Sequence, residues 1–209
     1  MAFGPIEVAF DETVLRPRPW TLAQSEWAAE LAAGAQPLLE IGCGAGHIGL
    51  AAAVLSGRRL VQVDRNPSAC RWAATNAADN GCADRVEQRC GAAGDVLAGG
   101  ELFAVVIADP PYVPSADVHL YPEDPLAAID GGPDGLAGVR EFLAAVDGHL
   151  HPQGSVVLQV RGAGQVGQLE EWLAEPAAPG LTVVGARSYG ETRALAHLVH
   201  RVVTTELSR

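Results

Sequence analysis

The segment Pro37–Ile48, PLLEIGCGAGHI, decides the fold of this chain. Its first five residues are typical of a short buried strand, and a helical pattern begins at His47. Between them stand three glycines spaced G-x-G-x-G, which allow a sharp turn and let a ligand approach the main chain closely. The spacing differs from the G-x-G-x-x-G dinucleotide fingerprint, and no lysine follows as in a phosphate loop. We therefore expect a strand, a glycine turn with a ligand beside it, and a helix.

Strands and helices alternate along the rest of the chain. Such alternation predicts an α/β fold, with a mainly parallel sheet covered on both faces by helices, and the two consecutive final strands predict an antiparallel end. Residues 110–136, which follow the predicted strand 103–108, contain no clear element, and long loops of this kind are usually functional or disordered. The expected helices are 22–33, 47–56, 67–80, 139–150 and 164–174, and the expected strands are 37–41, 59–63, 85–89, 103–108, 155–160, 181–186 and 194–203.

The overall composition is that of one folded domain without a membrane span. The chain has 209 residues, 48% of them hydrophobic, and no apolar run approaches the ~20 residues that cross a bilayer. The N-terminus lacks the pattern of a signal peptide, so we expect a cytoplasmic protein. Four cysteines without paired spacing predict reduced thiols and no metal site. The sequence does not determine the oligomeric state.

The net charge argues against a nucleic-acid partner. The chain carries 14 basic and 25 acidic residues, a formal charge of −11. Proteins that bind DNA or RNA normally present a basic surface, because neutralising phosphates supplies much of their affinity. We therefore expect an acceptor that is a protein or a small molecule.

An acidic residue stands at the end of the second predicted strand of the core. Asp64 follows the last glycine of the loop, Gly46, by 18 residues, near the separation at which a doubly wound fold places an acid against ribose hydroxyls. The alternative is structural: the glycines form a tight turn and Asp64 caps the next helix. His47 fits a capping or packing role at the start of its helix better than a chemical role.

The stretch Ala108–Tyr112, ADPPY, follows the apolar strand FAVVIA. Proline has no N–H donor and restricts the residue before it to extended conformations, so the pair ends the strand and fixes the backbone path. In an open α/β sheet ligands bind outside the carboxyl ends of the strands, which is where Asp109 stands. A mere strand-terminating turn is the alternative.

Together these motifs resemble the class I methyltransferases that use S-adenosylmethionine. The resemblance implies a Rossmann-like, seven-stranded, mainly parallel sheet with an antiparallel end strand. It also implies that the glycine loop lies under the methionine part of the cofactor and that Asp64 holds the ribose. Asp95 matches the position beside the adenine, although it would equally suit a solvated turn. The cofactor residues implied are Glu40, Gly42, Gly44, Gly46, Asp64, Arg65, Asp95 and Thr21.

Within that family, [D/N/S]-P-P-[Y/F/W] marks enzymes that methylate a nitrogen conjugated to a π system. Such a nitrogen is a poor nucleophile, because its lone pair is delocalised. A side-chain oxygen and a main-chain carbonyl that accept its N–H groups would orient it and favour developing positive charge. The resemblance thus implies Asp109, Pro110 and Tyr112 as catalytic residues, with the tyrosine stacking on the planar group.

Two further segments resemble the release-factor glutamine methyltransferase family (PrmC or HemK). Val14–Thr21, VLRPRPWT, is similar to the family's V-x-x-P-R-P-E-T, and Ile129–Leu136, IDGGPDGL, to its A-L-x-G-G-x-D-G-L. The alternative is a pair of exposed arginines and a flexible loop. The substrate residues implied are Arg18, Trp20, Pro111, Gly131 and Gly132.

The sequence departs from that family in ways that concern the acceptor. Asp109 replaces an asparagine, Trp20 replaces a glutamate, and we expect the usual N-terminal helical substrate-binding domain to be missing. An anionic Asp109 would stabilise a cationic nitrogen and could take up its proton, which suits an amine or amidine as well as an amide. Trp20 is either an aromatic wall for a planar substrate or part of the core.

We therefore expect an S-adenosylmethionine-dependent N-methyltransferase that acts on a protein glutamine amide. The alternatives are a small-molecule N-methyltransferase and, against the acidic charge, an enzyme that methylates RNA or DNA base amines. We expect one methyltransferase domain over residues 1–209. Within it, residues 1–36 cover the site, 37–209 form the core, and 110–136 form a substrate loop.

Overall fold

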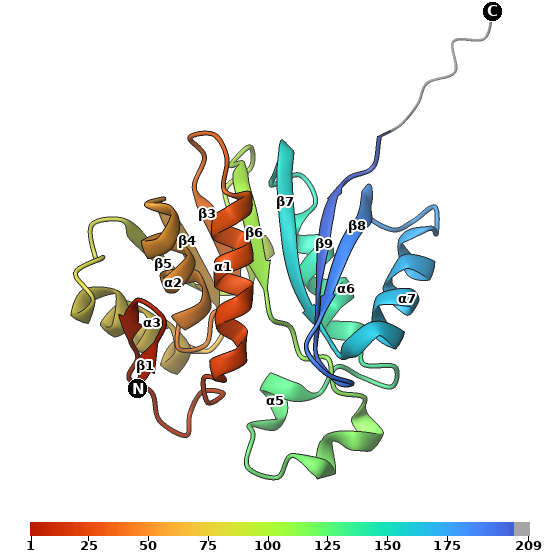
Figure 1. Ribbon diagram of the computed structural model, residues 1–209, viewed down its shortest axis with the longest axis horizontal. Helices are drawn as coiled ribbons and strands as arrows, with labels where there is room; N and C mark the ends of the chain where they lie inside the picture. The colour runs from red at the N-terminus through yellow and green to blue at the C-terminus, as the bar shows by residue number, and fades with distance from the viewer. Residues whose placement is uncertain (203–209) are drawn as a thin grey trace, which may run out of the picture.

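The computed structural model describes residues 1–202, which build one seven-stranded sheet and its covering helices (Figure 1). The strand order is β5-β4-β3-β6-β7-β9-β8. Neighbouring strands from β5 to β7 are parallel, and β9 runs antiparallel between β7 and β8. The predicted fold class is confirmed, although Val203 of the last predicted strand lies outside the described residues. The strands are β3 (Leu38–Ile41), β4 (Leu60–Asp64), β5 (Val86–Cys90), β6 (Phe103–Ala108), β7 (Leu150–Val160), β8 (Leu181–Ser188) and β9 (Ala194–His200).

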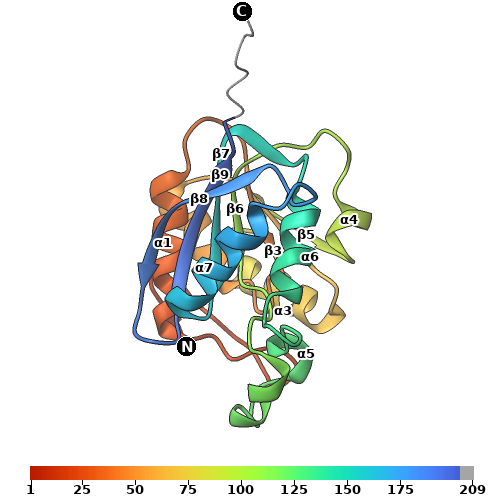
Figure 2. The ribbon, with the colours of Figure 1, turned by 90° about the vertical axis from the view of Figure 1, so that its right-hand side faces the viewer.

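Helices cover both faces of the sheet, as Figure 2 shows from its edge. One face packs against α1 (Leu22–Leu31), α2 (His47–Ser56) and α3 (Pro67–Asp79). The other packs against α4 (Ala93–Val96), α6 (Ala137–Val146) and α7 (Gly162–Leu173). The central strand β6 is buried along its whole length, because a parallel strand between two helical layers has no solvent face. Among residues 1–202, no helix is long and apolar enough to cross a membrane.

The structure corrects the predicted boundary between helix 139–150 and strand 155–160. Helix α6 ends at Val146, because Asp147 leaves the helical region and Gly148 adopts a φ of +84°. Strand β7 already begins at Leu150, which pairs with Phe103 of β6. The strand start was missed because it depends on a partner strand distant in sequence.

Two small features near the N-terminus were not predicted. A hairpin of β1 (Ala2–Phe3) and β2 (Ile6–Glu7) precedes the core, and a short 3-10 helix, η1 (Pro19–Thr21), leads into α1. Phe3 and Ile6 are buried in the cluster that includes residues of α2 and α3. The first residues of the chain therefore pack on the outside of the helical layer.

The segment 110–136 is an excursion with its own short helices. It contains η2 (Ser115–Leu120) and α5 (Leu126–Ile129), which Figure 1 shows beyond the end of the sheet to which β6 leads. Its two ends are joined where the Val113 N–H donates to the carbonyl oxygen of Ile129 over 2.9 Å, and the Gly131 N–H to that of Val113 over 2.8 Å. The excursion therefore leaves and re-enters the fold at one point.

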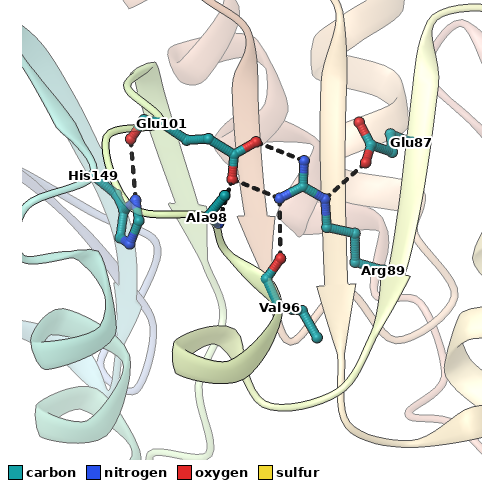
Figure 3. A network of polar contacts seen from close by, with 6 residues as sticks. All are labelled: Glu87, Arg89, Val96, Ala98, Glu101 and His149. Atoms are coloured by element: carbon teal, nitrogen blue, oxygen red, sulfur yellow. Dashed lines mark hydrogen bonds and ion pairs between the residues drawn. The ribbon is translucent and has the colours of Figure 1, made fainter.

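A polar network fixes the segment that follows β5 (Figure 3). Arg89 donates to both carboxylate oxygens of Glu101 over 2.7 Å and to the carbonyl oxygen of Val96 over 3.1 Å. Hydrogen bonding from Arg89 lowers the pKa of Glu101 to about 2. The loop that carries α4 is thereby fastened to β5.

Candidate active site

A cavity of about 540 Å³ lies at the carboxyl ends of β3, β4 and β6. That volume is within the usual range for a small-molecule or cofactor site. Nine of the predicted site residues line it: Arg18, Thr21, Glu40, Gly42, Gly44, Asp64, Arg65, Asp109 and Pro111. Seven do not line it: Trp20, Gly46, Asp95, Pro110, Tyr112, Gly131 and Gly132.

The three glycines between β3 and α2 have positive φ angles but different surroundings. A Cβ on Gly42 would lie 2.7 Å from Phe142, and one on Gly46 would lie 2.7 Å from the amide nitrogen of Gln62. A Cβ on Gly44 would meet nothing within 4 Å. Gly42 and Gly46 therefore permit close packing beneath the loop, and Gly44 leaves its cavity side open to a ligand.

Glu40 supports this loop from below. Its buried carboxylate accepts hydrogen bonds from the Gly49 N–H over 3.0 Å and from the Gln62 amide over 2.7 Å. Burial raises the pKa of Glu40 to about 8. Glu40 thus ties α2 and β4 to the glycine loop.

Asp64 joins the loop to the end of β4. Its Oδ2 accepts from the Gly44 N–H over 2.8 Å, and its Oδ1 accepts from the Asn66 N–H over 2.8 Å. A carboxylate has about four acceptor positions, so the side chain keeps acceptor capacity toward the cavity. The cap of α3 is Asn66, whose side chain accepts from the Ser68 N–H.

Asp109 directly follows β6, and its half-buried carboxyl group lines the cavity. Among residues 1–202 this carboxyl group has no hydrogen-bond or ion-pair partner, and the carbonyl oxygen of Pro110 accepts no hydrogen bond. Burial raises the pKa of Asp109 to about 7. The strand end therefore carries two acceptors in consecutive residues without partners among residues 1–202, and the Asp109 side chain is the one that lines the cavity.

Tyr112 lies behind this strand end. Its hydroxyl accepts a hydrogen bond from the Gln159 amide over 2.9 Å, and its carbonyl oxygen accepts one from Gln165 over 3.1 Å. Burial raises the pKa of the tyrosine above its ordinary value. In this structure the side chain is held by β7 rather than placed along the cavity wall.

The stretch 131–138 supports the strand end from the other side. A Cβ on Gly135 would lie 2.5 Å from the carbonyl oxygen of Tyr112, and one on Gly138 would lie 2.8 Å from that of Pro111. The carbonyl oxygen of Gly131 accepts from Ala137 N–H over 2.8 Å, and that of Gly132 from Ser115 N–H over 2.9 Å. These glycines let the backbone approach the Asp-Pro-Pro-Tyr segment closely.

The segment before α1 supplies one wall of the cavity. Arg18 donates to both carboxylate oxygens of Asp124 over 2.6 and 2.7 Å, which ties this wall to the excursion. The Thr21 hydroxyl donates to the Arg18 carbonyl oxygen over 2.8 Å. Trp20 instead packs beside Tyr189, with ring centroids 5.7 Å apart, and under Arg193. Trp20 is thus part of the core and not a wall of the cavity, and its side chain is partly exposed.

Both sequence and structure comparisons relate this chain to methyltransferases. A family model described as the methyltransferase small domain matches residues 28–121. A release factor glutamine methyltransferase of Gloeobacter violaceus is 34% identical over 176 residues, which are 77% of this chain and 58% of that protein. The chain is related to the release factor glutamine methyltransferases.

The chain spans less than two thirds of the length of the release factor glutamine methyltransferases that it matches. A ribosomal protein uL3 glutamine methyltransferase of Bordetella pertussis is 34% identical over 115 residues, 53% of this chain and 38% of that protein. The solved ribosomal protein L11 methylase of Lactobacillus delbrueckii superposes with a TM-score of 0.66 at 16% identity, covering 92% of this chain and 84% of that one. At that identity the likeness shows the fold alone.

Several residues line the cavity that no motif in the sequence indicated. Gly91–Gly94 line the cavity after β5, whereas Asp95 is exposed on α4 outside it. Phe142 and Glu141 of α6 also line it, and Glu141 forms an ion pair with Arg65. For residues 91–94, the two glycines at positions 91 and 94 were the available sequence signal. No sequence signal indicated that α6 lines the cavity, because its approach to the glycine loop depends on tertiary packing.

Proposed function

We propose that this protein is an S-adenosylmethionine-dependent N-methyltransferase that methylates the side-chain amide of a glutamine in a protein. The observation that carries the proposal is a single cavity that joins the glycine loop and Asp64 to the free carboxyl group of Asp109. The names of the related proteins, which are glutamine methyltransferases of a release factor and of ribosomal protein uL3, support the same acceptor class.

The residues on the loop side fit the cofactor. The open face of Gly44 admits a ligand, and Asp64 retains acceptor positions for ribose hydroxyls. The segment 91–94 and Phe142 close the same part of the cavity and would surround the adenine. When bound, the cofactor would supply an electrophilic methyl group. We keep Thr21 and Arg65 as cofactor contacts and assign Glu40, Gly46 and Gly42 to the support of the loop.

The residues on the acceptor side fit a primary amide. Such an amide has two N–H groups, and the Asp109 carboxyl group and the Pro110 carbonyl oxygen are two acceptors without partners among residues 1–202. Their hydrogen bonds would hold the nitrogen in one orientation and favour positive charge on it. Pro111 and Arg18 border this region, and Tyr112, Gly131 and Gly132 support it from behind.

The wider assignments from the sequence are part of the same proposal. We propose one methyltransferase domain, in which residues 1–36 cover the cavity, the segment from 37 forms the core, and 110–136 form the acceptor loop. The acidic composition favours a protein acceptor over a nucleic acid, and the cytoplasm is the compartment in which such an acceptor is made.

The first prediction separates cofactor binding from methyl transfer. We expect calorimetry to show S-adenosylmethionine binding to the wild-type protein. Because Asp109 would hydrogen-bond the acceptor nitrogen and make no hydrogen bond to the cofactor, Asp109→Ala should keep that affinity within about threefold while kcat falls roughly 100-fold or more. Methyl transfer is measured with labelled cofactor against a release factor, total RNA and a small-molecule extract in parallel.

Three outcomes would contradict the proposal. Folded wild-type protein without affinity for S-adenosylmethionine would exclude the cofactor. Label that enters RNA, with a steep loss of activity as salt rises, would favour a base amine as acceptor. Equal loss of cofactor affinity and turnover in Asp109→Ala would show that Asp109 is structural.

A further inference from the structure

Five carboxyl groups line the cavity, and they differ in what they bind. Glu40 and Asp64 accept backbone N–H groups of the glycine region, and Asp130 accepts from the Ser115 hydroxyl over 2.6 Å and from the Gly132 N–H over 2.9 Å. Glu141 pairs with Arg65. Among the residues that the structure describes, Asp109 alone of the five has no such partner. Four of these carboxyl groups therefore have a hydrogen-bond or ion-pair partner within the protein.

The charged surroundings do not neutralise Asp109. Of the arginines that line the cavity, Arg18 is held by Asp124 and Arg65 by Glu141, and Arg16 is exposed. The negative charge of Asp109 contributes to the raised pKa values of Glu40 and Tyr112, so both groups lie near it. Besides Asp109, the titratable and charged side chains that line the cavity are Arg16, Arg18, Glu40, Cys43, His47, Asp64, Arg65, Asp130 and Glu141. Tyr112 does not line it but is close enough for the charge of Asp109 to affect its pKa.

In these surroundings the Asp109 carboxyl group is close to the midpoint of its ionisation at neutral pH. Burial is the cause that raises the pKa of Asp109 to about 7, and no cation among residues 1–202 opposes it. His47 is neutral at this pH, because burial lowers its pKa to about 3. A group with a pKa near the working pH and a free acceptor oxygen has the properties of a general base.

We propose that Asp109 takes the proton that the acceptor nitrogen loses when it is methylated. This inference rests on the proposed function and adds a second role to the orienting hydrogen bond. The nitrogen lone pair forms the new N–C bond to the methyl carbon while the C–S bond breaks and its electron pair stays on sulfur. One N–H bond then breaks, its electron pair returns to nitrogen, and the proton moves to a carboxylate oxygen of Asp109.

The step is balanced without another reactant. Before transfer there is one positive charge, on sulfonium, and one negative charge, on Asp109; after it, the thioether, the methylated amide and the carboxylic acid are neutral. The proton is then released from Asp109 to water. No positive charge is left in a half-buried site, where it would be costly.

The test uses Asp109→Asn, which keeps an acceptor oxygen and nearly the same shape but cannot take a proton. With wild-type protein and a release factor as acceptor, kcat should rise about tenfold per pH unit below pH 7 and level off above it, because only the ionised carboxylate is active. Asp109→Asn should lower kcat roughly 100-fold and abolish that pH dependence. The matched control is Asp84→Asn, the same change at an exposed site outside the cavity.

A second measurement needs no methyl acceptor. Sinefungin carries a primary ammonium group where S-adenosylmethionine carries its methyl sulfonium, so its charge would lie beside Asp109. We expect the wild-type preference for sinefungin over S-adenosylhomocysteine to increase severalfold between pH 6 and pH 8, as the carboxyl group ionises. Asp109→Asn should show a preference that does not change with pH.

The outcomes separate this inference from the proposed function. Absence of binding of both cofactor analogues by folded wild-type protein would overturn the proposed function and the inference with it. Binding with a preference that has the same pH dependence in wild type and Asp109→Asn would overturn the proton role alone. Equal pH profiles of kcat in the two proteins would do the same. Thermal melts check folding, and Asp109→Asn should be at least as stable as wild type above pH 7, since it removes a buried charge.

Discussion

At the scale of single residues, the site depends on glycines that make room for a buried carboxylate. Gly49 lies in α2, where a Cβ would approach the Glu40 carboxylate to 2.4 Å. The same carboxylate accepts the Gly49 N–H and the Gln62 amide. A side chain at position 49 would therefore displace Glu40 and release its hold on the glycine loop.

We predict that Gly49→Ala destabilises the protein and weakens cofactor binding. Overpacking in a close-packed core costs about 1–3 kcal/mol, more than the roughly 1 kcal/mol gained by replacing glycine with alanine in a helix. The matched control is Gly167→Ala in α7, where a Cβ would meet nothing within 4 Å, and which should be neutral or stabilising. Urea unfolding and calorimetry with S-adenosylhomocysteine measure both effects; similar stability changes in the two variants would contradict the steric argument.

At the scale of elements, the excursion between β6 and α6 positions the strand end that carries Asp109. Its closing turn passes Gly135, which has a φ of +76° and lies against the carbonyl oxygen of Tyr112. Gln165 of α7 donates to both that oxygen and the carbonyl oxygen of Gly135, over 3.1 Å each. The acceptor side of the cavity is thus built by backbone packing, with few side chains involved.

We predict that Gly135→Ala impairs methyl transfer beyond its cost in backbone strain. The strain of a left-handed residue, about 1–2 kcal/mol, is shared by the control Gly100→Ala, whose φ is +86° and whose Cβ would meet nothing within 4 Å. Only Gly135→Ala adds a clash of about 1–3 kcal/mol and moves the Asp-Pro-Pro-Tyr backbone. Activity and unfolding are compared for both variants, and equal losses would refute the positioning role of this turn.

At the scale of the whole molecule, two segments distant in sequence close the cavity together. Arg18 comes from the segment before α1, and Asp124 from the excursion, and the Asp124 side chain is only 6% exposed. One guanidinium nitrogen of Arg18 donates to both carboxylate oxygens, and such a charge-assisted contact to a largely buried carboxylate is stronger than a solvent-exposed pair. The pair fixes the distance between the two walls.

We predict that Asp124→Asn weakens binding of S-adenosylhomocysteine severalfold and destabilises the protein by about 1–3 kcal/mol, because it leaves Arg18 without its charged partner. The control is Glu30→Gln, which makes the same chemical change in the exposed pair with Arg187 and should alter stability by less than about 0.5 kcal/mol. Hydrogen exchange should be faster near residues 13–18 and 115–129 only in Asp124→Asn. Unchanged exchange there would contradict the role of the pair.

The sequence alone predicted the alternation of elements, the sheet class and the two motifs at strand ends. These features follow from local rules: burial patterns, the conformational freedom of glycine and the restrictions of proline act within a few residues. The structure brings Glu40, Gly44, Asp64 and Asp109 to one cavity, since the carboxyl ends of parallel strands meet at one edge.

Other features were decided only by the tertiary structure. The start of β7 at Leu150 depends on pairing with β6, Trp20 packs on Tyr189 from the far end of the chain, and the 91–94 backbone lines the cavity in place of Asp95. Each of these depends on a partner that is distant in sequence, so no local pattern encodes it. The same holds for Asp109: the sequence placed its carboxyl group at the strand end, but only the packing around it determined that it is half-buried and without a neutralising cation.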